Sequence, residues 1–142
     1  MEYILQEGSF SLFSANWQDT SMTLLRDEES GLSLIVSRGA IPDGSDFEKE
    51  FHRQWDVLRS QMGEITQSEF QRVLVGQNNK TRAVEVETVF VRNDQQIWQK
   101  QFAVQVPGAA VVMIFTLSAL RAFTDEDSAR WSAIKQSLKL HE

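Results

Sequence analysis

The sequence predicts an α+β fold, built as a mainly antiparallel sheet of about six to seven strands with two helices packed on one face. Three observations predict it. Strand-like stretches come in two groups, and each group is followed by one amphipathic helical stretch. Short segments rich in Asn, Asp and Gly separate neighbouring strands, which favours antiparallel hairpins. The 142 residues suit one domain spanning residues 1–142.

Four strands are expected before the first helix, because apolar and polar residues alternate there or β-branched residues cluster. They cover residues 3–6, 9–13, 22–26 and 32–38. Residues 27–31, Asp-Glu-Glu-Ser-Gly, are typical of a charged hairpin turn between the last two of these strands.

The first helix is expected over residues 46–62, where Ser45 followed by Glu48 fits a capping box. Its apolar stripe consists of Phe47, Phe51, Trp55, Leu58 and Met62. Gln54 lies on this stripe, three residues after Phe51. It is either the edge of the stripe, with its amide in water, or an amide held at a partly buried surface to bind something specific.

The second group of strands is expected near residues 69–75, 82–91, 95–106 and 111–117, with turn chemistry at residues 77–80 and 93–94. The last helix begins near Thr124, where Asp127 completes another capping box. Trp131, Ile134 and Leu138 follow at helical spacing.

Composition excludes several classes of function. The net charge is −6 and Lys and Arg are not clustered, which argues against a nucleic acid or an anionic membrane surface as partner. Without cysteine there is no disulfide framework, no thiolate zinc site and no cysteine nucleophile. The most apolar run, residues 108–120, is too short to span a bilayer as a helix and is typical of a buried strand. The first residues lack the basic and apolar segments of an export signal, so a cytoplasmic protein is expected.

An unusual row of amides occupies one face of the strand QQIWQKQFAVQV, residues 95–106. Alternation places Trp98, Phe102 and Val104 on the other, core face. The amide row has two interpretations, which the strand alone leaves open. It is either a solvated face that happens to use glutamine or a neutral surface that binds a partner.

The predicted sheet has more uncharged surface than two helices on one face can cover. Residues 111–117 are apolar on both faces, and Met22 and Leu24 add to the excess. An uncovered apolar sheet face usually marks a dimer interface or a binding surface. A surface that combines Ser33, Ile35 and Ser37 with Gln99, Gln101 and Ala103 suits a partner that is apolar but carries a few polar groups, such as a transmembrane helix.

Catalytic and metal sites are not expected. His52 and His141 have no ligand spacing, and no glycine-rich phosphate loop or nucleophile elbow is present. Glu85 and Glu87 share a strand face and would be the carboxylate pair of a hydrolase, but a solvated outer face explains them more simply. We therefore expect no enzyme, no cofactor and no metal.

Several short motifs occur in an order and spacing that resemble a known family. They are Trp17-Gln18-Asp19-Thr20-Ser21, Leu34-Ile35-Val36-Ser37-Arg38, Phe47 with Phe51-His52-Arg53-Gln54, Gln99-Lys100-Gln101, and Trp131. Together they resemble the Eag-type chaperones of type VI secretion, within the DcrB-like group, whose fold is similar to the Mog1/PsbP α/β sandwiches. The resemblance covers nearly the whole chain.

The resemblance implies a cytoplasmic, non-catalytic homodimer that does not insert into the membrane. Such chaperones bind and shield the N-terminal transmembrane helices of PAAR-domain effectors, often Rhs toxins, before loading and export. The client-binding positions that the resemblance implies are Met22, Leu24, Ser33, Ile35, Ser37, Gln54, Gln99 and Gln101. The alternative is a Mog1/PsbP-like adaptor that binds a folded soluble protein.

Overall fold

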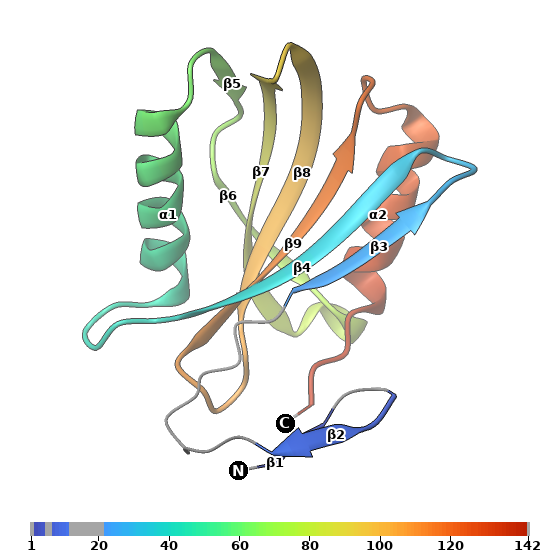
Figure 1. Cartoon of the computed structure of the whole chain (residues 1–142). Helices are drawn as coiled ribbons and strands as arrows, with labels where there is room; N and C mark the ends of the chain where they lie inside the picture. Colours follow the sequence, from blue (N-terminus) through green and yellow to red (C-terminus); the bar gives the residue numbers. More distant parts are fainter. Residues whose placement is uncertain (1, 5–6, 12–21, 142) are drawn as a thin grey trace.

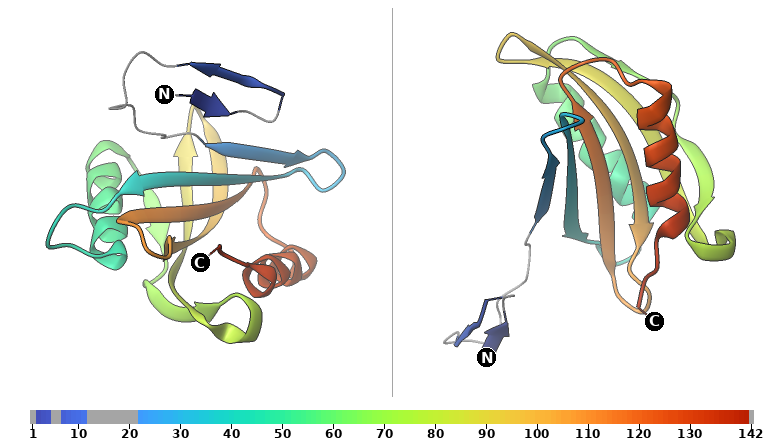
Figure 2. Two further views of the ribbon diagram at one scale, coloured as in Figure 1. Left: turned by 90° about the horizontal axis from the view of Figure 1, so that it is seen from below. Right: turned by 90° about the vertical axis from the view of Figure 1, so that its right-hand side faces the viewer.

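The computed structural model describes residues 2–4, 7–11 and 22–141. The motif at residues 17–21 and parts of the two strands expected at residues 3–6 and 9–13 lie outside the described residues. β1 (Glu2–Ile4) and β2 (Ser9–Ser11) pair with each other in a separate two-stranded sheet. That sheet lies apart from the larger one (Figure 2).

A seven-stranded antiparallel sheet forms the body of the protein (Figure 1). Its strands are β3 (Thr23–Asp27), β4 (Leu32–Ala40), β5 (Ile65–Gln67), β6 (Gln71–Val75), β7 (Thr81–Arg92), β8 (Gln95–Gln105) and β9 (Val111–Ala119). The order across the sheet is β3-β4-β9-β8-β7-β5, and β6 also pairs with β7. The predicted α+β class with a mainly antiparallel sheet is confirmed.

The hairpin turns form where the sequence predicts them. Asn93 and Asp94, between β7 and β8, both have positive φ, 51° and 63°, as a two-residue hairpin turn requires. Gly31 has a φ of 75° at the end of the β3–β4 turn, a conformation that costs glycine little. A short 3₁₀ turn, Gln77–Asn79, connects β6 to β7. The short strand β5 was not predicted.

Both helices begin at a side-chain cap. Helix α1 (Phe47–Gln61) is capped by Asp46, whose Oδ1 accepts a hydrogen bond of 2.8 Å from the backbone N–H of Lys49. The predicted cap at Ser45 is therefore wrong by one residue. Helix α2 (Asp125–Ser137) begins with the predicted capping box of Thr124 and Asp127, which is confirmed.

The helices lie on opposite faces of the sheet, so the prediction that both pack on one face is wrong (Figure 2). Trp131 of α2 packs against Phe102, whereas Phe51 and Trp55 of α1 belong to the same cluster as Ala103. Because consecutive strand residues point to opposite faces, Phe102 and Ala103 place the two helices on different sides.

Two cores result, one under each helix. On the α2 side the ring centroids of Phe102 and Phe115 lie 4.6 Å apart, and that of Trp131 lies 5.2 Å from Phe102. On the α1 side Phe51 and Trp55 are buried with Ile114 of β9. The two apolar faces of β9 are the physical reason, because each face needs its own cover.

A buried carboxylate connects the start of α2 to the β3–β4 turn. The guanidinium of Arg121 donates a hydrogen bond of 2.5 Å to Asp127 and one of 2.8 Å to the backbone oxygen of Ser30. Asp127 is 1% exposed and also accepts from the backbone N–H of Thr124. The hydrogen bond from Arg121 lowers the pKa of Asp127 from 3.8 to about 2, against the opposing effect of burial.

Replacing Asp127→Asn is expected to lower the free energy of unfolding by about 2 kcal/mol at pH 7. The folded-state pKa lies below the unfolded value, so this contribution is complete above about pH 4 and lost as the pH falls toward 2. Urea denaturation at pH 7 and pH 2.5 measures it, and the difference between variant and wild type should shrink at the lower pH. Asp125→Asn, an exposed acid in the same helical turn, is the control and should cost at most about 0.5 kcal/mol. Equal losses of unfolding free energy in the two variants would contradict a stabilising role for the ion pair between Asp127 and Arg121.

Candidate functional site

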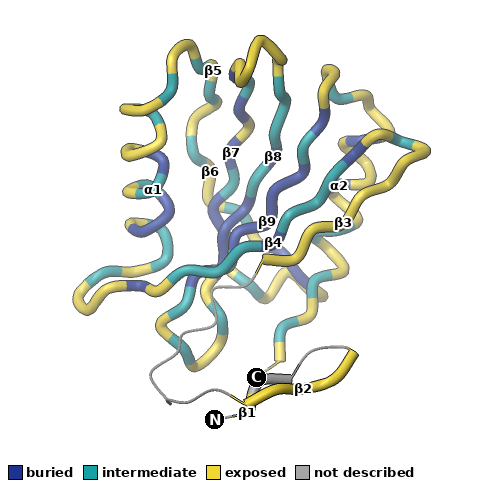
Figure 3. The backbone as a smooth tube through the Cα atoms, viewed as in Figure 1, coloured by how far each residue is buried: buried dark blue, intermediate teal, exposed yellow. Residues whose placement is uncertain are grey.

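Part of the α1 side of the sheet is not covered by α1. The helix packs over β8 and β9, whereas β3 is exposed along its length and β4 is mostly half-buried (Figure 3). We call the uncovered surface the open face. It consists of Leu24, Ser33, Ile35, Ser37, Gln99, Gln101 and Ser118, with Gln54 of α1 at its border.

The strand register brings these residues together in rows across the sheet. One row runs from Ser33 through Ser118 to Gln99. The next runs from Leu24 through Ile35 and Thr116 to Gln101. Residues that are distant in the sequence thus form one neutral surface of aliphatic, hydroxyl and amide groups.

The amides of the open face are held by hydroxyl groups of β9. Gln99 Nε2 donates to Ser118 Oγ at 3.2 Å, and Gln101 Nε2 donates to Thr116 Oγ1 at 2.9 Å. Gln101 Oε1 also accepts a hydrogen bond of 2.9 Å from Nε1 of the buried Trp55. Gln101 is therefore fixed on both sides of its amide, while each amide retains further hydrogen-bonding capacity toward a partner.

Gln54 lies at the border between α1 and β4. Its Nε2 donates to Glu50 Oε2 at 3.0 Å, and a Cβ atom added at Gly39 would lie 3.4 Å from the same nitrogen. Glu50 is 3% exposed, and the hydrogen bond from Arg53 lowers its pKa. The interpretation that Gln54 is only the edge of the apolar stripe, with its amide in water, is therefore incomplete, because the amide nitrogen donates to a buried carboxylate.

The outer border of the open face, at β3, carries exposed apolar side chains and one arginine. Leu24 is 52% exposed on β3, and Met22, directly before the strand, is 63% exposed. By the register, Arg26 of β3 lies on the same side as Ser33. It is the one charged residue that β3, β4, β8 and β9 place on this side, and the sequence analysis did not single it out.

By the strand register, six of the eight predicted site residues lie on one side of the sheet, and Gln54 of α1 borders them. Met22 precedes β3 and, among the described strands, has no register partner. The expectation that Ala103 belongs to this surface is wrong, because Ala103 is buried under α1.

The amides are held in place by three residues that were not predicted from the sequence, namely Thr116, Ser118 and Glu50. Alternation along β9 was the available signal for the first two, since Thr116 and Ser118 continue the face of Ile114. For Glu50 the available signal was its spacing, because residues four apart lie on one face of a helix and Glu50 precedes Gln54 by four.

The two faces of β8 are those that alternation predicted. Phe102 and Val104 are fully buried on the α2 side and Trp98 is half-buried there, whereas Gln95 and Gln105 are exposed near the ends of β8. Lys100 on the α2 side is 6% exposed and is paired with Glu87.

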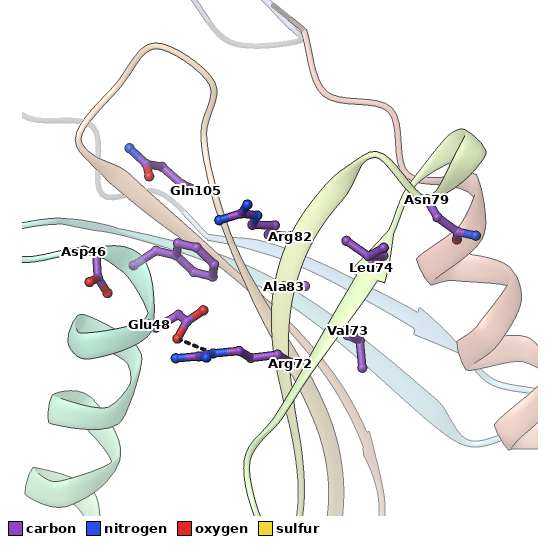
Figure 4. Close-up of a pocket in the computed structure, with 10 residues that line it drawn as sticks. Asp46, Glu48, Arg72, Val73, Leu74, Asn79, Arg82, Ala83 and Gln105 are labelled. Atoms are coloured by element: carbon purple, nitrogen blue, oxygen red, sulfur yellow. Dashed lines mark hydrogen bonds and ion pairs between the residues drawn. The ribbon is translucent and has the colours of Figure 1, made fainter.

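A cavity of about 920 Å³ lies elsewhere, between the start of α1 and the strands β6 and β7 (Figure 4). Figure 4 shows Arg82 and Leu74 on one side of it, and Glu48 joined to Arg72 by an ion pair of 3.0 Å. Its lining mixes both signs of charge with apolar side chains and contains none of the predicted site residues. We favour the open face as the site, because cavity size alone does not indicate a partner.

The two carboxylates considered for hydrolysis lie on the α2 side, each bonded to its own lysine. Glu85 Oε2 accepts from Lys135 Nζ at 2.7 Å, and Glu87 Oε1 accepts from Lys100 Nζ at 2.5 Å. The two glutamates therefore have a structural explanation, because Glu85 links β7 to α2 and Glu87 links β7 to β8. Within the described residues, no three His, Asp or Glu side chains are grouped as metal ligands.

Comparison with known proteins identifies the family. The sequence model of the DcrB family matches residues 7–137. The chain belongs to the DcrB family. A search of curated proteins gave no significant match to this DcrB-family protein.

One solved structure shows the same fold over the whole chain. It is PA94 from Pseudomonas aeruginosa, a protein of unknown function with a proposed regulatory role, and it matches with a TM-score of 0.75 and 20% sequence identity. The match covers 100% of this chain and 97% of PA94. At this identity the likeness concerns the fold. In the part of the DcrB-family chain that the structure describes, no helix has the length and apolar character needed to cross a membrane.

The hydrogen bond between Trp55 and Gln101 can be tested by Trp55→Phe, which removes the donor and retains an aromatic ring. We expect a loss of about 1–2 kcal/mol in the free energy of unfolding, because the amide oxygen loses a buried donor. Urea denaturation followed by circular dichroism measures it. Trp131→Phe, which deletes the same atoms from a similarly buried tryptophan on the other side of the sheet, is the control. Losses of equal size in both variants would show that the hydrogen bond contributes nothing.

Proposed function

We propose that this DcrB-family protein is a type VI secretion effector chaperone. It binds and shields the N-terminal transmembrane helices of a PAAR-domain, Rhs-type effector in the cytoplasm before loading and export. It acts as a binding protein without catalysis, cofactor or metal. The proposal extends the family assignment by the resemblance of the sequence motifs to Eag-type chaperones.

The open face is the observation that carries this proposal. The strands β3, β4, β8 and β9 present Ile35, small hydroxyl side chains and ordered amides at this surface. Arg26, at the border, is the one charged residue that these strands place on this side. Transmembrane helices pack through small residues and through Ser, Thr, Asn and Gln hydrogen bonds. The open face offers the same groups from a sheet.

The energetics favour neutral polar groups at such a surface. An exposed apolar helix in water is driven to bury its surface by about 25 cal/mol per Å², whether in an aggregate or on a chaperone. A charged side chain facing the helix would lose its hydration at high cost, whereas an amide loses less and exchanges hydrogen bonds with the client. Amides and hydroxyls on an open surface thus allow binding that remains reversible.

The free edge of β3 supports the homodimer. Among the described strands, β3 pairs only with β4, and Leu24 and Leu25 are 52% and 56% exposed on its two faces. An edge strand with exposed apolar side chains is a template for pairing with another chain. Antiparallel pairing of β3 with its copy would continue the sheet and place two open faces side by side, since a two-fold axis perpendicular to the sheet keeps them on one side.

The alternative function is a Mog1/PsbP-like adaptor that binds a folded soluble protein. The cavity near the start of α1 favours it, because a lining of paired and unpaired charges suits a polar, hydrated interface. Among the described residues Arg82 has no ion-pair partner there.

Co-expression with an N-terminal segment containing two apolar helices tests the chaperone function. The wild type is expected to keep the segment in solution as a complex, and Ile35→Glu should abolish the complex, because it places a charge in the centre of the open face. Affinity purification of the tagged segment measures recovery of the chaperone. Leu74→Glu is the matched control, since Leu74 is 57% exposed and borders the other cavity. Loss of binding in Leu74→Glu, with Ile35→Glu unaffected, would favour the adaptor and reject the open face.

Light scattering after size-exclusion chromatography tests the dimer. The wild type is expected to have about twice the chain mass of 16.3 kDa, and Leu25→Lys should reduce it to one chain by placing like charges together across the β3 edge. Leu120→Lys, at a residue 64% exposed outside β3, should remain dimeric. A wild type of single-chain mass, or a dimer insensitive to Leu25→Lys, would contradict pairing through β3.

A further inference from the structure

Glu50 is a buried carboxylate at the point where α1 meets β4. It is 3% exposed, and Arg53 holds it with two hydrogen bonds, from Nε to Oε1 at 2.7 Å and from Nη2 to Oε2 at 2.6 Å. These bonds lower the pKa of Glu50, against the opposing effect of burial. The carboxylate is therefore ionised at neutral pH, and an ionised carboxylate only accepts hydrogen bonds.

This fixes the orientation of the neighbouring amide. Gln54 lies 3.0 Å from Glu50 Oε2, and because the carboxylate cannot donate, the side of the amide that faces it must be the NH₂ group. Gly39 of β4 lies beside this nitrogen, since a Cβ atom added there would be in ordinary van der Waals contact with Gln54 Nε2, at 3.4 Å. The nitrogen of Gln54 thus faces the protein.

The oxygen of Gln54 remains available. Among the described residues Gln54 Oε1 has no hydrogen-bond partner, and no buried side-chain oxygen or nitrogen there lacks one, so this oxygen is accessible to solvent. Gln101 differs, because its oxygen accepts from Trp55 and its nitrogen donates to Thr116. The border of the open face at Gln54 therefore offers an acceptor of fixed orientation.

We propose that Glu50 is a positioning residue that turns the carbonyl of Gln54 toward the bound partner, so that the open face selects apolar segments with an O–H or N–H donor at this point. The proposal rests on the proposed function for the nature of the partner, an apolar helix. A serine or threonine hydroxyl in such a helix is the donor that fits, because it adds little volume and costs less to desolvate than a charge.

Binding of two synthetic peptides tests the selection. Both are 20-residue Leu/Ala helices with identical lysine flanks and a fluorescent label. They differ at one position, which is Ser in one peptide and Ala in the other. A series of such pairs moves this position along the helix. At the best position the wild type should bind the Ser peptide roughly five- to tenfold more tightly, the value of one hydrogen bond. Glu50→Gln and Gln54→Leu should reduce the ratio toward one, because the first releases the amide of Gln54 and the second removes it.

Two controls accompany the peptides. Gln99→Leu removes an amide that Glu50 does not hold, so the preference for the Ser peptide should remain. Glu50→Asp retains the negative charge and should therefore retain part of the preference for the Ser peptide. A Ser preference that persists in Glu50→Gln and Gln54→Leu would overturn the proposal.

Side-chain amide NMR in the protein without peptide gives a readout independent of any partner. One Nε2 proton of Gln54 should exchange slowly with solvent in the wild type and rapidly in Glu50→Gln, whereas the exposed Glu64→Gln should leave it unchanged. Fast exchange in the wild type would reject the positioning role. Slow exchange in a protein that binds neither peptide would instead reject the proposed function and leave the geometry of Glu50 established.

Discussion

The fold depends on one constraint, namely that the central strands are apolar on both faces. β9 places Phe115 on one side and Ile114 on the other, and both are nearly fully buried. A sheet of this kind is stable only when both faces are covered. The two helices meet this demand from opposite sides, α2 through Trp131 and α1 through Phe51 and Trp55. Because α1 is 15 residues long and packs over β8 and β9, it leaves β3 and β4 without cover.

The uncovered part of the sheet is ordered by internal hydrogen bonds. Ser118 and Thr116 hold the amides of Gln99 and Gln101, and Glu50 holds that of Gln54. Fixing these side chains before binding reduces the conformational entropy lost in a complex. A neutral surface that is ordered in advance fits a partner that is apolar and has few polar groups, which is the client class we propose.

Several ion pairs and the open face lie on different sides of the sheet. The ion pairs of Glu85, Glu87 and Asp127 all lie on the α2 side or at the start of α2. On the α1 side the strands of the open face carry Arg26 alone. These ion pairs are thereby kept away from the open face, where, in the function we propose, they would hinder burial of an apolar partner.

The sequence by itself determined the α+β class, the hairpins at Gly31 and Asn93, the capping box at Thr124 and the two faces of β8. Each follows from alternation or from turn and cap chemistry, which act between residues close in the chain. Only the tertiary structure decided that the helices cover opposite faces, that Trp55 orients Gln101, and that Gln54 lies against β4. Those facts depend on contacts such as that between Trp55 and Gln101, 46 residues apart, which no local pattern encodes.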